Sequence, residues 1–281
     1  MYTQFYRLHG EPFLLAPDHR FYFESSVHAQ AMAYLTYGIS RGEGFIVITG
    51  EIGAGKTMLA STLARKMASQ TFVLAQVVST SLEADDLVRM VAGAFGLPQE
   101  NSKAALLSRI EQFLLACHGQ GKRVLLVVDE AQNLPIRALE ELRMLSNFVY
   151  AGKPLLQTFL LGQPEFRKTL LSPQLEQLRQ RVTASCHLGP MDGAETEAYI
   201  RHRLQTVGWR DDPSFSSDAF AAIYQFTGGI PRRINMLCDR LLLTGRLDEK
   251  HAFTANEVDE VINELQQEFA PVELRAGGKG G

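Results

Sequence analysis

The sequence predicts an α/β fold in which helices cover both faces of a parallel sheet, followed by a small all-helical domain. Short apolar, β-branched runs alternate with amphipathic stretches, at residues 45–50, 72–78, 124–129, 155–162 and 182–188. Continuous apolar runs of this length are typical of strands buried on both faces of a parallel sheet. After Pro190 the pattern predicts helices only, over about 192–207, 217–226, 231–243 and 254–269.

Two helix starts in the second half carry local signals. Pro231 follows Gly228 and Gly229, and a proline suits the first position of a helix. Thr254 with Glu257 three places on predicts a capping box. These signals, with the change of pattern at Pro190, predict an α/β core with an N-terminal arm over residues 1–190 and a helical lid domain over 191–270. The glycine-rich residues 271–281 read as a flexible tail.

Composition and charge limit the function classes. The 281 residues are 46% hydrophobic and carry a formal net charge of −3, so nucleic acid is not an expected partner of the whole molecule. Cys117, Cys186 and Cys238 are odd in number and widely spaced, which argues against disulfides and zinc and favours a reducing cytoplasm. No apolar run approaches the roughly 18 residues of a spanning helix, so we expect no transmembrane segment.

The first chemical motif lies between the 45–50 strand and the helix expected from about Thr57. Residues Gly50-Glu51-Ile52-Gly53-Ala54-Gly55-Lys56-Thr57 match GxxxxGK[ST], the pattern of a phosphate-binding loop. Its glycines let backbone N–H groups point inward, Lys56 reaches the β- and γ-phosphates, and the Thr57 hydroxyl can ligate Mg²⁺. We expect ATP to contact this whole loop and Met58 after it.

A second motif follows the strand at 124–129. Asp129 is placed to hold Mg²⁺, and Glu130 is placed to polarise the attacking water. Alone, an apolar run ending in two acids is usually a strand entering a polar loop. With a phosphate-binding loop upstream, however, a functional role for the two carboxylates is the better interpretation. Gln132 and Asn133 are interpreted as turn and helix-cap residues before Pro135.

Further polar residues are candidates for sensing or completing the site. Gln163 ends the next strand and could orient water or the γ-phosphate, although a glutamine before proline is often a turn residue. Arg179 or Arg181, with Arg181 preferred, could reach a neighbouring subunit's γ-phosphate as an arginine finger. Arg232 and Arg233 open a helix, where cations oppose the helix dipole and call for an anion such as phosphate.

Other residues receive structural interpretations. His28, His118, His187 and His202 show no metal-ligand spacing and are expected to be surface or core residues. The aromatic residues near the start are expected to pack, with covering the adenine as the alternative, and Trp209 is expected to pack within the lid. The aromatic residues concerned are Phe13, Phe21, Tyr22 and Phe23.

With GEIGAGKT, VVDEAQNL, GQPE, LRQRV and GGIPRRIN in this order, the chain resembles AAA+ ATPases of the ExeA-like general secretion pathway protein A family. The resemblance extends to the opening arm, and the GEGFIVITGEIGAGKT stretch is most similar to secretion ATPases of PEP-CTERM/exosortase loci. It implies Walker A at the glycine-rich loop, Walker B at Asp129 and Glu130, sensor 1 near Gln163, a finger at Arg181 or Arg179 and sensor 2 at Arg232 or Arg233.

The resemblance also implies ATP and Mg²⁺ as cofactors and a homo-oligomer whose sites are completed at subunit interfaces. Family members typically continue into a transmembrane helix and a peptidoglycan-binding domain, whereas this chain ends in the glycine-rich tail. The leading hypothesis is a cytoplasmic ATPase, possibly held at the inner membrane by partners, that serves an envelope secretion or exopolysaccharide export machine. The alternatives are an ATP-dependent DNA-binding regulator resembling transposition ATPases and a slowly hydrolysing nucleotide-gated scaffold.

Overall fold

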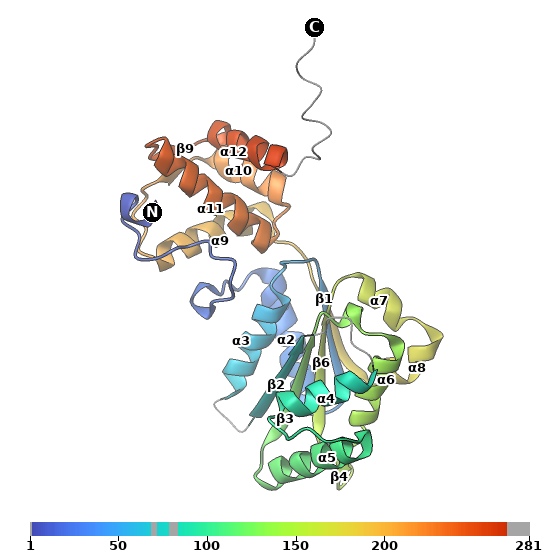
Figure 1. The fold of residues 1–281 in the computed structure, drawn as a ribbon. Coiled ribbons are helices and arrows are strands. Elements are labelled where there is room, and N and C mark those ends of the chain that lie inside the picture. Colours follow the sequence, from blue (N-terminus) through green and yellow to red (C-terminus); the bar gives the residue numbers. More distant parts are fainter. Residues whose placement is uncertain (1, 69–71, 79–83, 269–281) are drawn as a thin grey trace. The chain divides into compact units, whose positions relative to one another are not determined.

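The computed structural model describes residues 2–68, 72–78 and 84–268. The chain forms two compact units: one comprises Ser26–Gly189, and the other combines the chain before Ser26 with the chain from Pro190 onward. Both units are drawn in Figure 1. We call them the sheet unit and the helical unit.

The sheet unit contains a five-stranded parallel sheet in the order β2-β3-β6-β1-β7 (Figure 1). The strands are β1 (Phe45–Gly50), β2 (Phe72–Val78), β3 (Arg123–Asp129), β6 (Leu156–Gly162) and β7 (Val182–Leu188). The five apolar runs of the sequence therefore are strands. Strands β1, β3 and β6 are buried almost throughout, whereas β2 and β7 each contain exposed and half-buried residues. The expectation of burial on both faces is wrong for these two because they form the sheet edges.

Helices cover both faces of this sheet. On one face lie α2 (Ser26–Arg41) and α3 (Lys56–Ala68); on the other lie α4 (Ala84–Ala94), α5 (Lys103–Gly119) and α6 (Ile136–Leu145). Side chains of a strand alternate between faces, so Phe45 and Val47 share a core with α4, α5 and α6 while Ile46 faces Gly38 of α2. The carboxyl ends of β1, β3 and β6 consequently meet at one edge of the sheet.

Short elements connect the strands. A 3-10 turn, η2 (Ala131–Asn133), follows β3, and the two-residue strands β4 (Val149–Tyr150) and β5 (Lys153–Pro154) form a hairpin before β6. After β6 come α7 (Glu165–Leu170), η3 (Pro173–Leu175) and α8 (Glu176–Arg179). The η2 turn matters most for function because it holds the residues that follow Asp129.

The helical unit is built on α9 (Gly193–Thr206), α10 (Ser217–Thr227), α11 (Pro231–Leu247) and α12 (Ala255–Glu268). Their apolar faces share one core. The expectation of helices only after Pro190 is incomplete, because β8 (Ser214–Phe215) and β9 (Ala252–Phe253) pair in parallel between the helices. Runs of two residues are too short to give a periodic signal.

The N-terminal arm, with α1 (Tyr2–Phe5) and η1 (His19–Phe21), corrects the expected domain layout. Its aromatic side chains, including Phe13 and Phe21, are buried in the core of the helical unit. Arg203 of α9 donates to the carbonyl of Pro12 and lies over the Phe21 ring, 4.5 Å from its centroid. The arm was expected to belong to the 1–190 domain, but it completes the core of the helical unit. Apolar burial, not chain order, decides its place.

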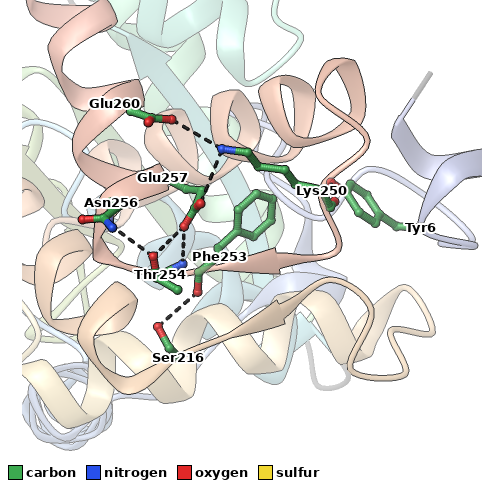
Figure 2. Close-up of polar contacts among 8 residues, drawn as sticks. All are labelled: Tyr6, Ser216, Lys250, Phe253, Thr254, Asn256, Glu257 and Glu260. Carbon is green, nitrogen blue, oxygen red and sulfur yellow. Dashed lines mark hydrogen bonds and ion pairs between the residues drawn. The ribbon is translucent and has the colours of Figure 1, made fainter.

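The start of α12 shows how the helical unit is fixed locally (Figure 2). One carboxylate oxygen of Glu257 accepts hydrogen bonds from the backbone N–H of Thr254 at 2.8 Å and from its hydroxyl at 2.6 Å. The Thr254 hydroxyl oxygen in turn accepts from the N–H of Asn256 at 3.3 Å. The Glu257 half of the predicted capping box is therefore present. The Thr254 hydroxyl oxygen, however, accepts from the N–H of Asn256 and not from that of Glu257, which a full capping box requires.

Two expectations concern the end of the chain and the membrane. The flexible tail over 271–281 and the last residue of the predicted 254–269 helix lie outside the described residues. Among the helices that the structure describes, none is both long enough and apolar enough to span a bilayer.

Candidate nucleotide site

The loop from Gly50 to Thr57 links β1 to α3 at the carboxyl edge of the sheet. A Cβ atom on Gly50 would lie 2.6 Å from the carbonyl oxygen of Leu188 in the neighbouring strand, so only glycine fits there. Gly53 and Gly55 have φ angles of 83° and 95°, in the region that side chains disfavour. The glycines of the motif are thus required by the loop's own geometry.

Lys56 is the first residue of α3 and is 93% buried, with 7% of its surface exposed. Its Nζ donates to the carbonyls of Gly50 at 2.8 Å and Glu51 at 3.0 Å. Burial lowers the pKa of the Lys56 ammonium, while the carboxylates of Glu130, Asp129 and Glu51 act in the opposite direction. The side chain curls back over its own loop, which places its amino group where the phosphates of a nucleotide in this loop would lie.

The other residues expected to contact the nucleotide differ in how exposed they are to solvent. Glu51 and Ile52 are exposed at the loop's tip, Ala54 is buried, and Met58 is half-buried in the first turn of α3. The buried histidine His28 of α2 lies against the loop, because its Nε2 would be 3.0 Å from a Cβ on Gly55. The interpretation of His28 as a core residue fits its burial, but its place beside the loop was not predicted.

Thr57 and Asp129 meet although they come from different elements. The Thr57 hydroxyl donates to Oδ2 of Asp129 at 2.6 Å, and Asp129 is almost fully buried at the end of β3. A hydroxyl and a carboxylate at this separation are both oxygen ligands of the kind that Mg²⁺ binds. These two residues fit the predicted metal site.

Glu130 follows at the start of η2 with an unusual backbone. Its φ and ψ of 54° and 40° are left-handed, a conformation that is uncommon for residues other than glycine. Its N–H donates to Oδ1 of Asp129 at 2.9 Å, which ties the turn to the strand end. Such a strained backbone is often found at functional sites.

The Glu130 carboxylate is held by two amides. Its Oε2 accepts from Nε2 of Gln163 at 3.3 Å and from Nε2 of Gln132. The Oε1 atom of Gln132 also accepts from the backbone N–H of Gln163 at 3.0 Å. Gln163 therefore contacts Glu130 from the end of β6. The interpretation of Gln132 as a turn residue missed its role, since its signal lies in a contact with another strand.

The structure does not bring the finger candidates to this edge. Arg181 immediately precedes β7, whose Val182 is paired with Phe45 at the start of β1. Five residues of strand separate that level from Gly50, or about 16 Å along the sheet. The Arg181 guanidinium donates to the Ser146 hydroxyl at 2.7 Å, and Arg179 donates to the Leu170 carbonyl at 3.0 Å. Arg181 therefore lies too far along the sheet to belong to the same copy's nucleotide site, and the Arg179 side chain is engaged with the last residue of α7.

The sensor candidates lie in the helical unit. Arg232 and Arg233 are both exposed in the first turn of α11, directly after Pro231. Within the described part of the chain, neither side chain forms a hydrogen bond or an ion pair. Asp239, a carboxylate that could have paired with Arg232, instead accepts from the Tyr2 hydroxyl at 2.5 Å.

Comparison with known proteins gives a family model and a relative. A family model described as "AAA domain" matches residues 39–170. General secretion pathway protein A of Aeromonas hydrophila is 38% identical over 260 residues, which cover 92% of this chain and 47% of that protein. Residues 39–170 are thus similar to an AAA domain, and the chain is similar to general secretion pathway protein A over most of its own length. It spans about half the length of that relative.

Solved structures show the same fold at low sequence identity. Cdc6p from Pyrobaculum aerophilum has a TM-score of 0.71 at 15% identity, with 94% of this chain and 74% of that chain covered. The ORC2 protein of Aeropyrum pernix, solved as ADPNP-ADP complexes, scores 0.65 at 17% identity over 85% and 66% of the two chains. The RuvB branch migration motor of Thermotoga maritima scores 0.60 at 18% identity over 88% and 70%. The fold is that of an AAA+ P-loop protein.

Proposed function

We propose that the sheet unit binds ATP with Mg²⁺ and hydrolyses it. The observation that carries this proposal is the convergence of a buried lysine, a hydroxyl–carboxylate pair and a second, hydrogen-bonded carboxylate at one sheet edge. These are the groups that phosphoryl transfer to water requires: a cation for the phosphates, metal ligands and a base for the water.

Each residue has a distinct role in this proposal. Lys56 neutralises the β- and γ-phosphates, Thr57 and Asp129 hold Mg²⁺, and Glu130 orients and polarises the attacking water. The backbone N–H groups from Gly50 to Met58 cradle the phosphates at the amino end of α3. Bound Mg²⁺ adds charge neutralisation at the transferring phosphoryl group. Gln163 acts from the end of β6 through its contact with Glu130.

The site is completed, in this proposal, by a second copy of the chain. Arg181 lies at the opposite sheet edge from Lys56, so it can reach a phosphate only in another subunit. Arg232, with Arg233 beside it, senses the γ-phosphate from the helical unit. The role of Arg181 makes a homo-oligomer the active form.

The process served is proposed from the relative. Kinship with general secretion pathway protein A supports an ATPase that assists an envelope secretion machine from the cytoplasmic side, with protein partners at the inner membrane. Service to an exopolysaccharide or exosortase-associated export system is the finer form of this proposal. It rests on the sequence resemblance of residues 42–57.

Equilibrium ATP binding tests the assignment of the site. In Lys56→Ala the phosphates lose their buried cation, so the affinity for MgATP should fall by about 10- to 100-fold, as for one charge-assisted contact of about 1.5–3 kcal/mol. Lys122→Ala, which removes an exposed lysine elsewhere in the sheet unit, is the matched control. Equal affinities in the two variants, measured by titration calorimetry, would refute the site.

A further inference from the structure

Gln132 is not used by the roles above, yet it contacts two of the residues that carry them. We infer that Gln132 is a positioning residue that holds the Glu130 carboxylate in the orientation needed for hydrolysis. The inference rests on the proposed function, because it assigns a role to Gln132 only if Glu130 acts on water.

The amide of Gln132 is used at both ends. Its Nε2 donates to Oε2 of Glu130, and its Oε1 accepts from the N–H of Gln163 at 3.0 Å. A side-chain amide with both ends paired cannot rotate without losing hydrogen bonds. Gln132 thus bridges the turn after β3 and the end of β6. Because the Gln163 N–H holds its Oε1 atom, the Nε2 atom is directed at the Glu130 carboxylate.

The bridge determines which oxygen of Glu130 is engaged. Oε2 accepts from Gln132 and also from Nε2 of Gln163 at 3.3 Å. No side chain in the described part of the chain donates to Oε1, which leaves this atom as the acceptor for a water molecule. Because both amides donate to the same oxygen, they restrain the position of Oε2 relative to the ends of β3 and β6.

The backbone makes this restraint useful. Glu130 is in the left-handed region, and without Gln132 its carboxylate would keep the amide of Gln163, at 3.3 Å, as its one side-chain donor among the described residues. A catalytic base that can rotate loses part of its efficiency, because the reacting water must meet it at one distance and angle. Gln132, two residues after Glu130, supplies that restraint with a neutral side chain.

A purely structural role makes different predictions. If Gln132 only tied η2 to β6, the hydrogen bond from the Gln163 N–H to its Oε1 atom would be enough, and its Nε2 donor would not matter for hydrolysis. Gln132→Glu keeps an oxygen for the Gln163 N–H but removes the donor and places a second carboxylate against Glu130. The fixed charges around Glu130, Lys56 from α3 and Asp129 from β3, stay in place. Gln132→Ala removes both ends, and Asn133→Asp adds the same charge to the exposed neighbour as a control.

Steady-state ATPase kinetics with purified full chains test the inference. We expect kcat to fall about 10- to 100-fold in Gln132→Glu and Gln132→Ala, the size typical of lost outer-shell partners, with KM for ATP and equilibrium ATP binding within about twofold of wild type. Asn133→Asp should behave as wild type.

Other results overturn the inference. Unchanged kcat in both Gln132 variants, an effect confined to KM, or an equal loss in Asn133→Asp would each show that Gln132 does not position the base. Glu130→Gln, assayed alongside, separates this failure from that of the proposed function. If Glu130→Gln turns over normally, the base assignment fails; if it stalls while the Gln132 variants do not, only the role of Gln132 is wrong.

Discussion

The hydroxyl of Thr57 and the carboxylate of Asp129 lie 2.6 Å apart, although 72 residues separate them in the sequence. The contact joins the first turn of α3 to the end of β3. It exists because β1 and β3 run parallel and end at the same edge, with β6 between them. Two oxygen ligands from separate elements therefore face one position beside Lys56.

Loss of charge at Asp129 should weaken the metal and leave the fold intact. Asp129→Asn keeps the side chain's shape and an acceptor for Thr57 but removes the negative charge that Mg²⁺ prefers. The Mg²⁺ concentration for half-maximal ATPase activity should rise at least about 10-fold, the equivalent of about 1.4 kcal/mol. A magnesium titration at fixed ATP checks this, and an unchanged midpoint would remove Asp129 from the metal site.

Arg181 should act on the nucleotide of a neighbouring subunit. Arg181→Ala should bind ATP normally and lose most hydrolysis, since the nucleotide site within one copy does not include it. Mixing it with Lys56→Ala protein should restore part of the activity, because some interfaces then pair an intact loop with an intact arginine. Arg179→Ala, which loses a contact to a backbone carbonyl, is the comparison.

A failure of this complementation would have a clear meaning. If ATPase activity per chain does not depend on protein concentration and mixing restores nothing, the nucleotide site works without a second subunit. The pair of arginines would then serve only the packing around Ser146 and Leu170.

Arg232 should couple nucleotide state to the helical unit. Two cations in the first turn of α11 oppose the helix dipole and have no partner among the described residues, so a γ-phosphate would relieve that cost. Trp209, whose indole N–H donates to the Pro213 carbonyl at 2.9 Å, is the chain's single tryptophan and reports from the same unit. In a Glu130→Gln background, ATP and ADP should give different Trp209 fluorescence, and Arg232→Ala should abolish the difference.

The companion variant decides between the two arginines. If the ATP-dependent signal persists in Arg232→Ala and disappears in Arg233→Ala, their roles are exchanged. If it survives the loss of both, neither residue senses nucleotide.

Glu257 should stabilise the helical unit in a pH-dependent way. Hydrogen bonds from the Thr254 hydroxyl and backbone hold the pKa of Glu257 at about 2, below its ordinary 4.5. A carboxylate whose pKa is lowered by folding stabilises the native state above the ordinary value and loses that effect as pH falls through the lowered one. Glu257→Gln should therefore cost about 0.5–1 kcal/mol at pH 7 and progressively less between pH 4.5 and 2.

Urea unfolding followed by Trp209 fluorescence measures this difference. Glu264→Gln, an exposed change on the same helix, should show no such pH dependence. A constant difference between wild type and Glu257→Gln across the acidic range would mean that the cap does not depend on the carboxylate's charge.

Sequence patterns located the strands and the charged residues of the site for physical reasons. Apolar runs report burial directly, and the glycine-rich loop is constrained at each glycine by backbone geometry. Gln132 and the N-terminal arm were beyond such patterns. The position of a glutamine amide depends on the strand opposite, and the arm's aromatic residues could complete the core of either unit. The left-handed backbone of Glu130 cannot be predicted from the sequence, because glycine is the residue type that signals such a conformation and this position is a glutamate.

Single-turnover hydrolysis by Glu130→Gln shows whether Glu130 activates water at a site that binds MgATP. The amide keeps the size of the side chain but cannot act as a base. We expect ATP affinity within about twofold of wild type and a hydrolysis rate at least about 100-fold lower, the usual contribution of a positioned base. Hydrolysis at the wild-type rate, with ATP bound normally, would show that Glu130 is not the base.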